Sequence, residues 1–209
     1  MRRIVGAIAL MAAAAAPALG QTHVPDVAKP PEVKLWRFDC GDMPGIPLAM
    51  FSDTYAYGDK TIDMPVSCYL IKHGDQYMVW DTGFGTEYLH EHPKGIAEVR
   101  MRRLLVDQLK DVGVTPDRIA IVGISHDHGD HVGQAAYFPK AKLLMGAADL
   151  KAMRDGTSMQ GVERERIGPW LSADSNAEGV VGDKDVFGDG SVVMLATPGH
   201  TQGHHSLLV

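Results

Sequence analysis

The 209-residue chain has 20 basic and 26 acidic residues, a formal net charge of −6, and 45% apolar content. This composition is typical of a soluble globular protein that is long enough to bury one sizeable core. Because the chain is acidic and has no stripe of lysine and arginine, nucleic acid is excluded as an expected partner.

The first twenty residues have the pattern of a secretory signal peptide. Two arginines precede an apolar run from Ile4 to Ala16, and cleavage is expected between Gly20 and Gln21. The run is too short to span a bilayer comfortably, so no permanent membrane anchor is expected. Removal of residues 1–20 would leave a net charge of −8. The predicted location is the periplasm or the outside of the cell.

The rest of the chain predicts one α/β (α+β) domain with helices packed on sheets. Polar, proline-rich residues 21–33 predict a flexible lead-in. A strand at 34–41 and an irregular stretch at 42–65 precede a hairpin whose turn is "HGDQ". Helical spacing predicts a helix at Ile96–Val112, with its arginines on the solvated face. The remaining expected elements are a strand at 119–124, a strand at 141–146, a helix at 147–155, a polar loop through about 185, a strand at 191–197 and a strand beginning at 204.

The two cysteines, Cys40 and Cys68, both lie at the ends of apolar strand-like runs. In an oxidising compartment, a disulfide that closes their 28-residue separation would contribute about 3–4 kcal/mol. Two buried free thiols fit the pattern equally well, so the sequence leaves the pairing open.

Four of the ten histidines lie in glycine-containing loops after predicted strands. His126 and His128, in "SHDHGDH", can point to the same side of a tightly turned segment. His200, in the sharp turn "TPGH", supplies a third imidazole. Histidine is the commonest metal ligand, so these three predict a metal site. Asp130 and His131 lie further along the first loop, where they are better placed to reach a second ion.

The segments "VWDTG", "SHDHGDH" and "TPGHTQGHHS" resemble the signature segments of the metallo-β-lactamase-fold hydrolases, in order and in spacing. The resemblance runs from about residue 34 to the end, and implies a four-layer αββα sandwich over 34–209 with two metal ions, usually zinc. The site residues that it implies are His126, His128 and His200 for the first metal, Asp130 and His131 for the second, and Asp81 as a carboxylate that orients the loop.

Other histidines are expected to lie outside this site. In the family's pattern His204 supports the loop and His205 points outward on its strand. His90 and His92 have no nearby acid or third ligand, which indicates a solvated loop.

The resemblance also implies a bridging aspartate and a further histidine, which in the family follow the Pro-Gly-His segment by one or more strands. The sequence ends at Val209, and the nearby acids Asp183, Asp185 and Asp189 precede His200. We therefore expect a C-terminally incomplete domain that lacks the final strands and helix. It would hold a complete three-histidine site and half of a second one.

A metal ion that is held by three imidazoles and keeps one position open lowers the pKa of its bound water to about 7. The sequence therefore predicts a zinc-dependent hydrolase in which a metal-bound hydroxide attacks a small-molecule lactone or ester, and Asp130 transfers a proton. The flanking segments resemble the N-acyl homoserine lactonase (quorum-quenching) branch most. The apolar segment 49–57 either lines an acyl-chain groove or packs on the sheet. The alternatives are a periplasmic metallo-β-lactamase and a non-catalytic, truncated zinc-binding fragment; a homodimer is compatible with each.

Overall fold

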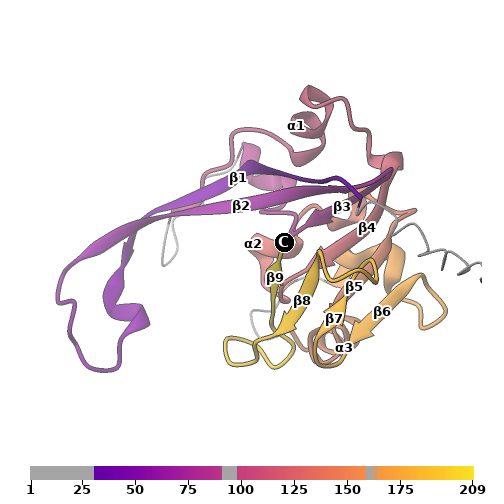
Figure 1. Ribbon diagram of the computed structural model, residues 1–209. Coiled ribbons are helices and arrows are strands. Elements are labelled where there is room, and N and C mark those ends of the chain that lie inside the picture. Colours follow the sequence, from indigo (N-terminus) through magenta and orange to yellow (C-terminus); the bar gives the residue numbers. More distant parts are fainter. Residues whose placement is uncertain (1–30, 91–97, 159–161, 163) are drawn as a thin grey trace, which may run out of the picture.

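Two β-sheets form the body of the protein (Figure 1). The computed structural model describes residues 31–90, 98–158, 162 and 164–209, so the expected signal peptide and nearly all of the expected lead-in lie outside the described residues. The six-stranded sheet comprises β1 (Val33–Pro47), β2 (Thr61–His73), β3 (Gln76–Trp80), β4 (Ile119–Ile124), β5 (Lys142–Gly146) and β6 (Ala177–Val180). The three-stranded sheet comprises β7 (Lys184–Asp185), β8 (Val193–Ala196) and β9 (His205–Leu208).

Short helices connect the strands. The α-helices are α1 (Leu105–Asp111), α2 (Gly129–Val132) and α3 (Ala147–Asp155). The 3-10 helices are η1 (Leu48–Phe51), η2 (Thr86–Leu89), η3 (Pro116–Arg118), η4 (Ala135–Tyr137) and η5 (Arg164–Trp170). In the part of the chain that the structure describes, no helix is long and apolar enough to cross a membrane.

The order and direction of the strands in the large sheet determine at which edge the connecting loops lie. Strands β1, β2 and β3 pair antiparallel, whereas β3, β4, β5 and β6 pair parallel in chain order. Parallel neighbours need crossover connections, which α1, α2 and α3 help to supply. The carboxyl ends of β3, β4 and β5 therefore lie at the same edge of the sheet. The loop that carries His126, His128, Asp130 and His131 starts at this edge, after β4.

The large sheet has a core on each face. On one face, side chains of α1, α3 and η5, such as Leu109, Met153 and Trp170, pack into a buried cluster with the strands. On the other face, Met78 and Leu144 belong to a cluster that includes residues of the small sheet. The described residues thus form helix, sheet and sheet layers. Among them there is no outer helical layer on the small sheet.

The predicted irregular stretch at 42–65 is wrong at both ends. Strand β1 continues to Pro47 and β2 begins at Thr61, so the two strands run past the rest of the sheet as an arm (Figure 1). Their pairing shifts register between Asp39 and Asp42 and again between Met43 and Ile46. Such bulges let an antiparallel ladder absorb glycine and proline, which is why these residues do not end the strands here.

The predicted helix at Ile96–Val112 is also wrong over its described first part, because α1 begins only at Leu105. Arg100 instead pairs with Asp42 through two backbone hydrogen bonds of 2.9 Å, which hold this segment beside β1. The predicted polar loop through about 185 is wrong as well, since it contains η5 and the sixth strand of the sheet. The other predicted strands and the helix at 147–155 are confirmed.

Cys40 and Cys68 form a disulfide between β1 and β2, with their Cα atoms 5.8 Å apart. Both residues are fully buried. The structure therefore decides the question that the sequence left open, in favour of the bond.

Candidate metal centre

Three imidazoles from two distant segments converge at the edge of the large sheet. His126 and His128 follow β4, and His200 lies in the loop between β8 and β9. One ring nitrogen from each of the three lies within 4.8 Å of the others. His200 Nε2 is 3.1 Å from His128 Nδ1, and the ring centroids of His126 and His200 are 4.7 Å apart. The geometry therefore brings together the three predicted ligands of the first metal.

Contacts behind the rings hold the His200 loop in place. The backbone N–H of His205 donates to Ser125 O at 2.9 Å, which joins β9 to the end of β4. The buried Asp149 carboxylate in α3 accepts hydrogen bonds from Thr201 Oγ1 and from the backbone N–H of Gly203. These bonds attach the part of the loop that follows His200 to the large sheet and to α3, which restricts the position of His200.

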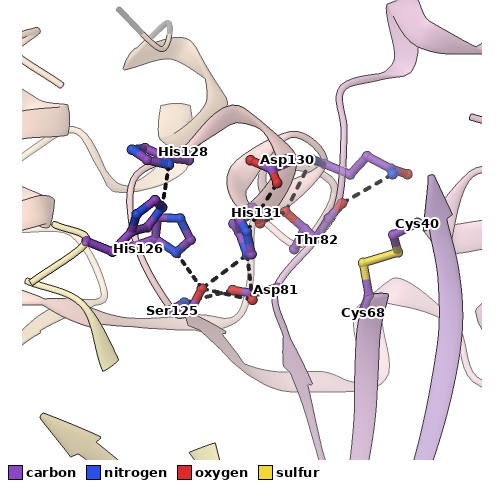
Figure 2. A network of polar contacts seen from close by, with 11 residues as sticks. Cys40, Cys68, Asp81, Thr82, Ser125, His126, His128, Asp130 and His131 are labelled. Atoms are coloured by element: carbon purple, nitrogen blue, oxygen red, sulfur yellow. Dashed lines mark hydrogen bonds and ion pairs between the residues drawn. A yellow bond between two sulfur atoms is a disulfide. The ribbon is translucent and has the colours of Figure 1, made fainter. Parts of the chain in front are cut away.

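The donor atoms of the cluster fit a metal ion. Nε2 of His126 and Nε2 of His128 are buried and have no hydrogen-bond partner, although buried polar atoms are normally satisfied. Ser125 Oγ donates to Asp81 Oδ2 at 2.9 Å and lies 2.9 Å from His126 Nδ1 (Figure 2). Because its one proton is used by Asp81, Ser125 accepts from Nδ1–H of His126. The lone pair of His126 is therefore on Nε2, where a cation would satisfy it.

The electrostatics also favour neutral rings. Burial, and then the neighbouring His131, lowers the pKa of His126 to about 2. Burial, and then His200, lowers the pKa of His128. Since an imidazole binds a metal only when its ligating nitrogen is deprotonated, the cluster is able to bind a metal ion at neutral pH.

Asp130 and His131 lie in α2, beside the three-histidine cluster. His131 Nδ1 is 2.8 Å from Asp81 Oδ2, and His131 Nε2 is 3.3 Å from Asp130 Oδ2 (Figure 2). Burial lowers the pKa of His131, but the Asp81 and Asp130 carboxylates outweigh it and raise the pKa to about 10. Burial alone would raise the pKa of Asp130, but the hydrogen bond and the charge of His131 outweigh burial and lower this pKa below its usual value. The structure thus places the two residues as an ion pair beside the three rings.

Asp81 connects the end of β3 to two points of the histidine loop that follows β4. Its carboxylate accepts hydrogen bonds from the Ser125 backbone N–H at 2.7 Å, from Ser125 Oγ and from His131 Nδ1. Its φ of 56° lies in the left-handed region, which a residue other than glycine adopts rarely. Such strain persists where surrounding contacts over-determine the conformation, and here the three hydrogen bonds do so.

The sequence analysis missed a second set of contacts that holds the same loops. Thr82 donates to His131 O from its backbone N–H at 2.7 Å and from Oγ1 at 2.9 Å. The fully buried Gln134 accepts from Leu105 N and donates from Nε2 to Thr82 O and Phe84 O. The available signal was an amide between the apolar residues of "HVGQAAYF". A buried amide must find several partners, and here it finds them in two segments, at Thr82 and Phe84 and at Leu105.

The remaining histidines differ from expectation in one case. His205 was predicted to point outward, but it is buried, with Nδ1 2.8 Å from Gly203 O and Nε2 3.0 Å from Gly182 O. His204 Nδ1 lies 2.9 Å from Thr197 Oγ1. His90 is exposed at the end of η2, and His92 lies outside the described residues.

A cavity of about 540 Å³ lies beside the cluster. His128, Asp130 and His200 line it at the metal centre, and most of its other lining residues are apolar. These are Met43, Ile46, Met50, Phe51, Met64, Phe84, Tyr88 and Val162. Met50 and Phe51 belong to segment 49–57, which was predicted either to line an acyl-chain groove or to pack on the sheet. They line the cavity and are more than half exposed, which favours the groove over packing on the sheet.

Comparisons with known proteins agree with this architecture. Residues 61–209 match the metallo-beta-lactamase superfamily. Metallo-hydrolase mfmC of Annulohypoxylon moriforme is 27% identical over 222 residues, which cover 90% of this chain and 54% of that protein. N-acyl homoserine lactonase AttM of Rhizobium johnstonii is 30% identical over 164 residues, which cover 70% of this chain and 60% of that protein. The chain thus spans between 54% and 60% of the length of these curated relatives.

A solved structure shows the same fold. The quorum-quenching N-acyl homoserine lactone hydrolase superposes with a TM-score of 0.67 at 24% identity, covering 86% of this chain and 69% of the other. Because the family match extends over more than half of the residues, the chain belongs to the metallo-beta-lactamase superfamily.

Proposed function

We propose that this chain belongs to a zinc-dependent hydrolase that opens lactones bearing an acyl chain, as in N-acyl homoserine lactones. The observation that carries the proposal is the junction of two features. Three clustered imidazoles, two of which have a buried nitrogen without a hydrogen-bond partner, lie beside a cavity whose other walls are mainly apolar. The lactonase relatives support the choice of substrate class.

His126, His128 and His200 would hold the first metal ion. Three neutral nitrogen donors and an open position are the ligand set of catalytic zinc sites. Zinc bound there supplies a Lewis acid and a bound water whose pKa is lowered towards neutrality. Asp130 and His131 offer a carboxylate and an imidazole towards a second ion, and binding there requires His131 to release its proton.

Asp130 would move the proton at the leaving oxygen. It lines the cavity beside His128 and His200, and His131 holds it in the charged form. A carboxylate at this place can accept a proton from the attacking water and donate it to the departing alcohol of the opened ring. The apolar walls would bind the acyl chain by removing its surface from water.

The proposal includes export of the protein. Two observations support it: the signal-peptide pattern of residues 1–20, and the Cys40–Cys68 disulfide, since such bonds persist in oxidising compartments. Cell fractionation of the tagged protein tests this part, and retention in the cytoplasm with residues 1–20 intact would contradict it.

The catalytic proposal is tested with the purified chain loaded with zinc. Ring opening of N-decanoyl homoserine lactone is followed by proton release, with a cephalosporin as the competing substrate. We expect lactone turnover that chelation abolishes, and a loss of about 100-fold or more in Asp130→Asn. Faster cephalosporin turnover would favour a β-lactamase. One weakly bound ion and no turnover of either substrate would favour a non-catalytic zinc-binding fragment.

A further inference from the structure

An ion pair separates the metal cavity from a second cavity. Glu87 of η2 and Arg166 of η5 line both the cavity of about 540 Å³ at the metal centre and a neighbouring one of about 470 Å³. The second cavity shares no other residue with the first, and its remaining lining residues are Thr86, Gly133, Ala136, Tyr137 and Glu165. The two side chains therefore stand where the cavities meet.

The pair is bidentate and rigidly held. Arg166 Nη2 donates to Glu87 Oε1 at 2.6 Å, and Nη1 donates to Glu87 Oε2 at 3.1 Å. Nη1 also lies 3.4 Å from the carbonyl oxygen of Gly133, directly after α2. Side chains of the pair are only 23% and 35% exposed, so the fork is partly withdrawn from water. Two parallel hydrogen bonds give this pair a defined geometry, unlike most surface ion pairs.

The neighbouring backbone is adapted to the pair. A side chain at Gly85 would collide with the Arg166 guanidinium and with the Glu87 carboxylate. Burial raises the pKa of Glu87, but the hydrogen bond from Arg166 outweighs burial and lowers it, so the carboxylate stays charged. An apolar chain that lies in the metal cavity thus meets a charged pair at the place where the second cavity begins.

We propose that the Glu87–Arg166 pair is a specificity-determining partition, which ends the acyl-chain site and sets the longest chain that the enzyme accommodates. The proposal rests on the proposed lactonase function. Moving past the pair would require an apolar chain to separate two charges and to break the two hydrogen bonds between them, which is unfavourable. Without the pair, the second cavity becomes a continuation of the site, and Ala136 and Tyr137 supply apolar surface there.

The test is a chain-length profile of kcat/KM with butanoyl, hexanoyl, decanoyl and dodecanoyl homoserine lactones. Each methylene that becomes buried raises kcat/KM about fourfold. In the wild-type enzyme we expect kcat/KM to stop rising once the acyl chain is long enough to reach the partition. The double variant Glu87→Ala/Arg166→Ala removes both charges together, and we expect it to extend the rise to the longest substrate.

Two controls separate the partition from other effects. Glu165→Ala changes a residue that lines only the second cavity, and we expect it to keep the wild-type profile. The exchange Glu87→Arg/Arg166→Glu restores a pair, and we expect it to restore the wild-type limit. Melting temperatures of the zinc-loaded proteins show that each variant is folded.

The outcomes are distinct. An unchanged profile in the double variant, or an equal loss for all chain lengths, would overturn the partition. Failure of the wild-type enzyme to open any lactone would overturn the proposed function instead. The partition is then measured by calorimetric binding of the ring-opened N-dodecanoyl homoserine to wild type and double variant. Equal affinity of the two proteins would overturn it.

Discussion

The substitution Gly146→Ala is expected to weaken zinc binding about 100-fold, although it changes none of the metal ligands. Gly146 ends β5, and the backbone of Gly203 in the His200 loop lies against it. An ideal Cβ at position 146 would be 2.6 Å from the Gly203 carbonyl carbon and 2.8 Å from Gly203 Cα, with the carbonyl oxygen nearer still. The backbone angles of Gly146, φ −53° and ψ 135°, suit alanine, so the effect arises from this contact.

The size of the effect follows from the overlap. Carbon atoms in contact are about 3.5–4.0 Å apart, so the two segments must separate by about 1 Å. Gly203 is three residues from His200, and a metal site tolerates errors of about 0.2 Å in its ligand distances. We therefore expect zinc affinity to fall by about 100-fold, comparable with or larger than the loss of a contact that orients a ligand. Overpacking is also expected to lower the free energy of unfolding by about 1–3 kcal/mol.

The assay is competition for zinc with a chromophoric chelator, with near-ultraviolet circular dichroism as the check on folding. Gly168→Ala is the matched control, because no heavy atom outside its chain neighbours lies within 4 Å of its ideal Cβ. A folded Gly146→Ala protein that binds zinc as tightly as the wild type would refute the reasoning. It would show that His200 does not depend on the close approach of these two segments.

Three further predictions concern stability. Gln134→Ala leaves three buried backbone groups without partners and should lower the free energy of unfolding in urea by about 3–6 kcal/mol; a loss below 1 kcal/mol would contradict this role. Replacing Cys40 and Cys68 together by alanine should cost about 3–4 kcal/mol, and equal urea midpoints would contradict it. Hydrogen bonds, the largest from Ser191, lower the pKa of Asp189 from 3.8 to about 2. The advantage of wild type over Asp189→Asn should therefore be complete above about pH 4 and vanish as pH falls through about 2, whereas a pH-independent advantage would refute it.

The parts of the site that follow from local sequence were predictable. The loop "SHDHGDH" follows β4, whose continuous apolar run identifies a buried strand, and the spacing within the loop then places two imidazoles together. Strand β5 and helix α3 were predicted from the same kind of contiguous pattern. The convergence of His200 with these rings was predicted because the sharp turn "TPGH" offers a third imidazole, although nothing local to that turn indicates where β8 and β9 lie.

The parts that depend on tertiary contacts were not predictable in this way. The spacing before α1 is helical, but backbone pairing of Arg100 with Asp42 prevents a helix there. His205 was assigned to the outer face by the family's pattern. Side chains two apart on a strand share a face, and Leu207 packs against the small core cluster, so alternation along β9 would have predicted the inward position. Gln134 was missed because its partners lie in two segments that are far from it in sequence.

The most direct test of this account is an anomalous difference map at the zinc edge from crystals of the zinc-loaded protein. The account predicts a peak about 2.0–2.1 Å from one ring nitrogen of each of His126, His128 and His200. A peak at another place, or one coordinated by fewer than these three rings, would contradict it.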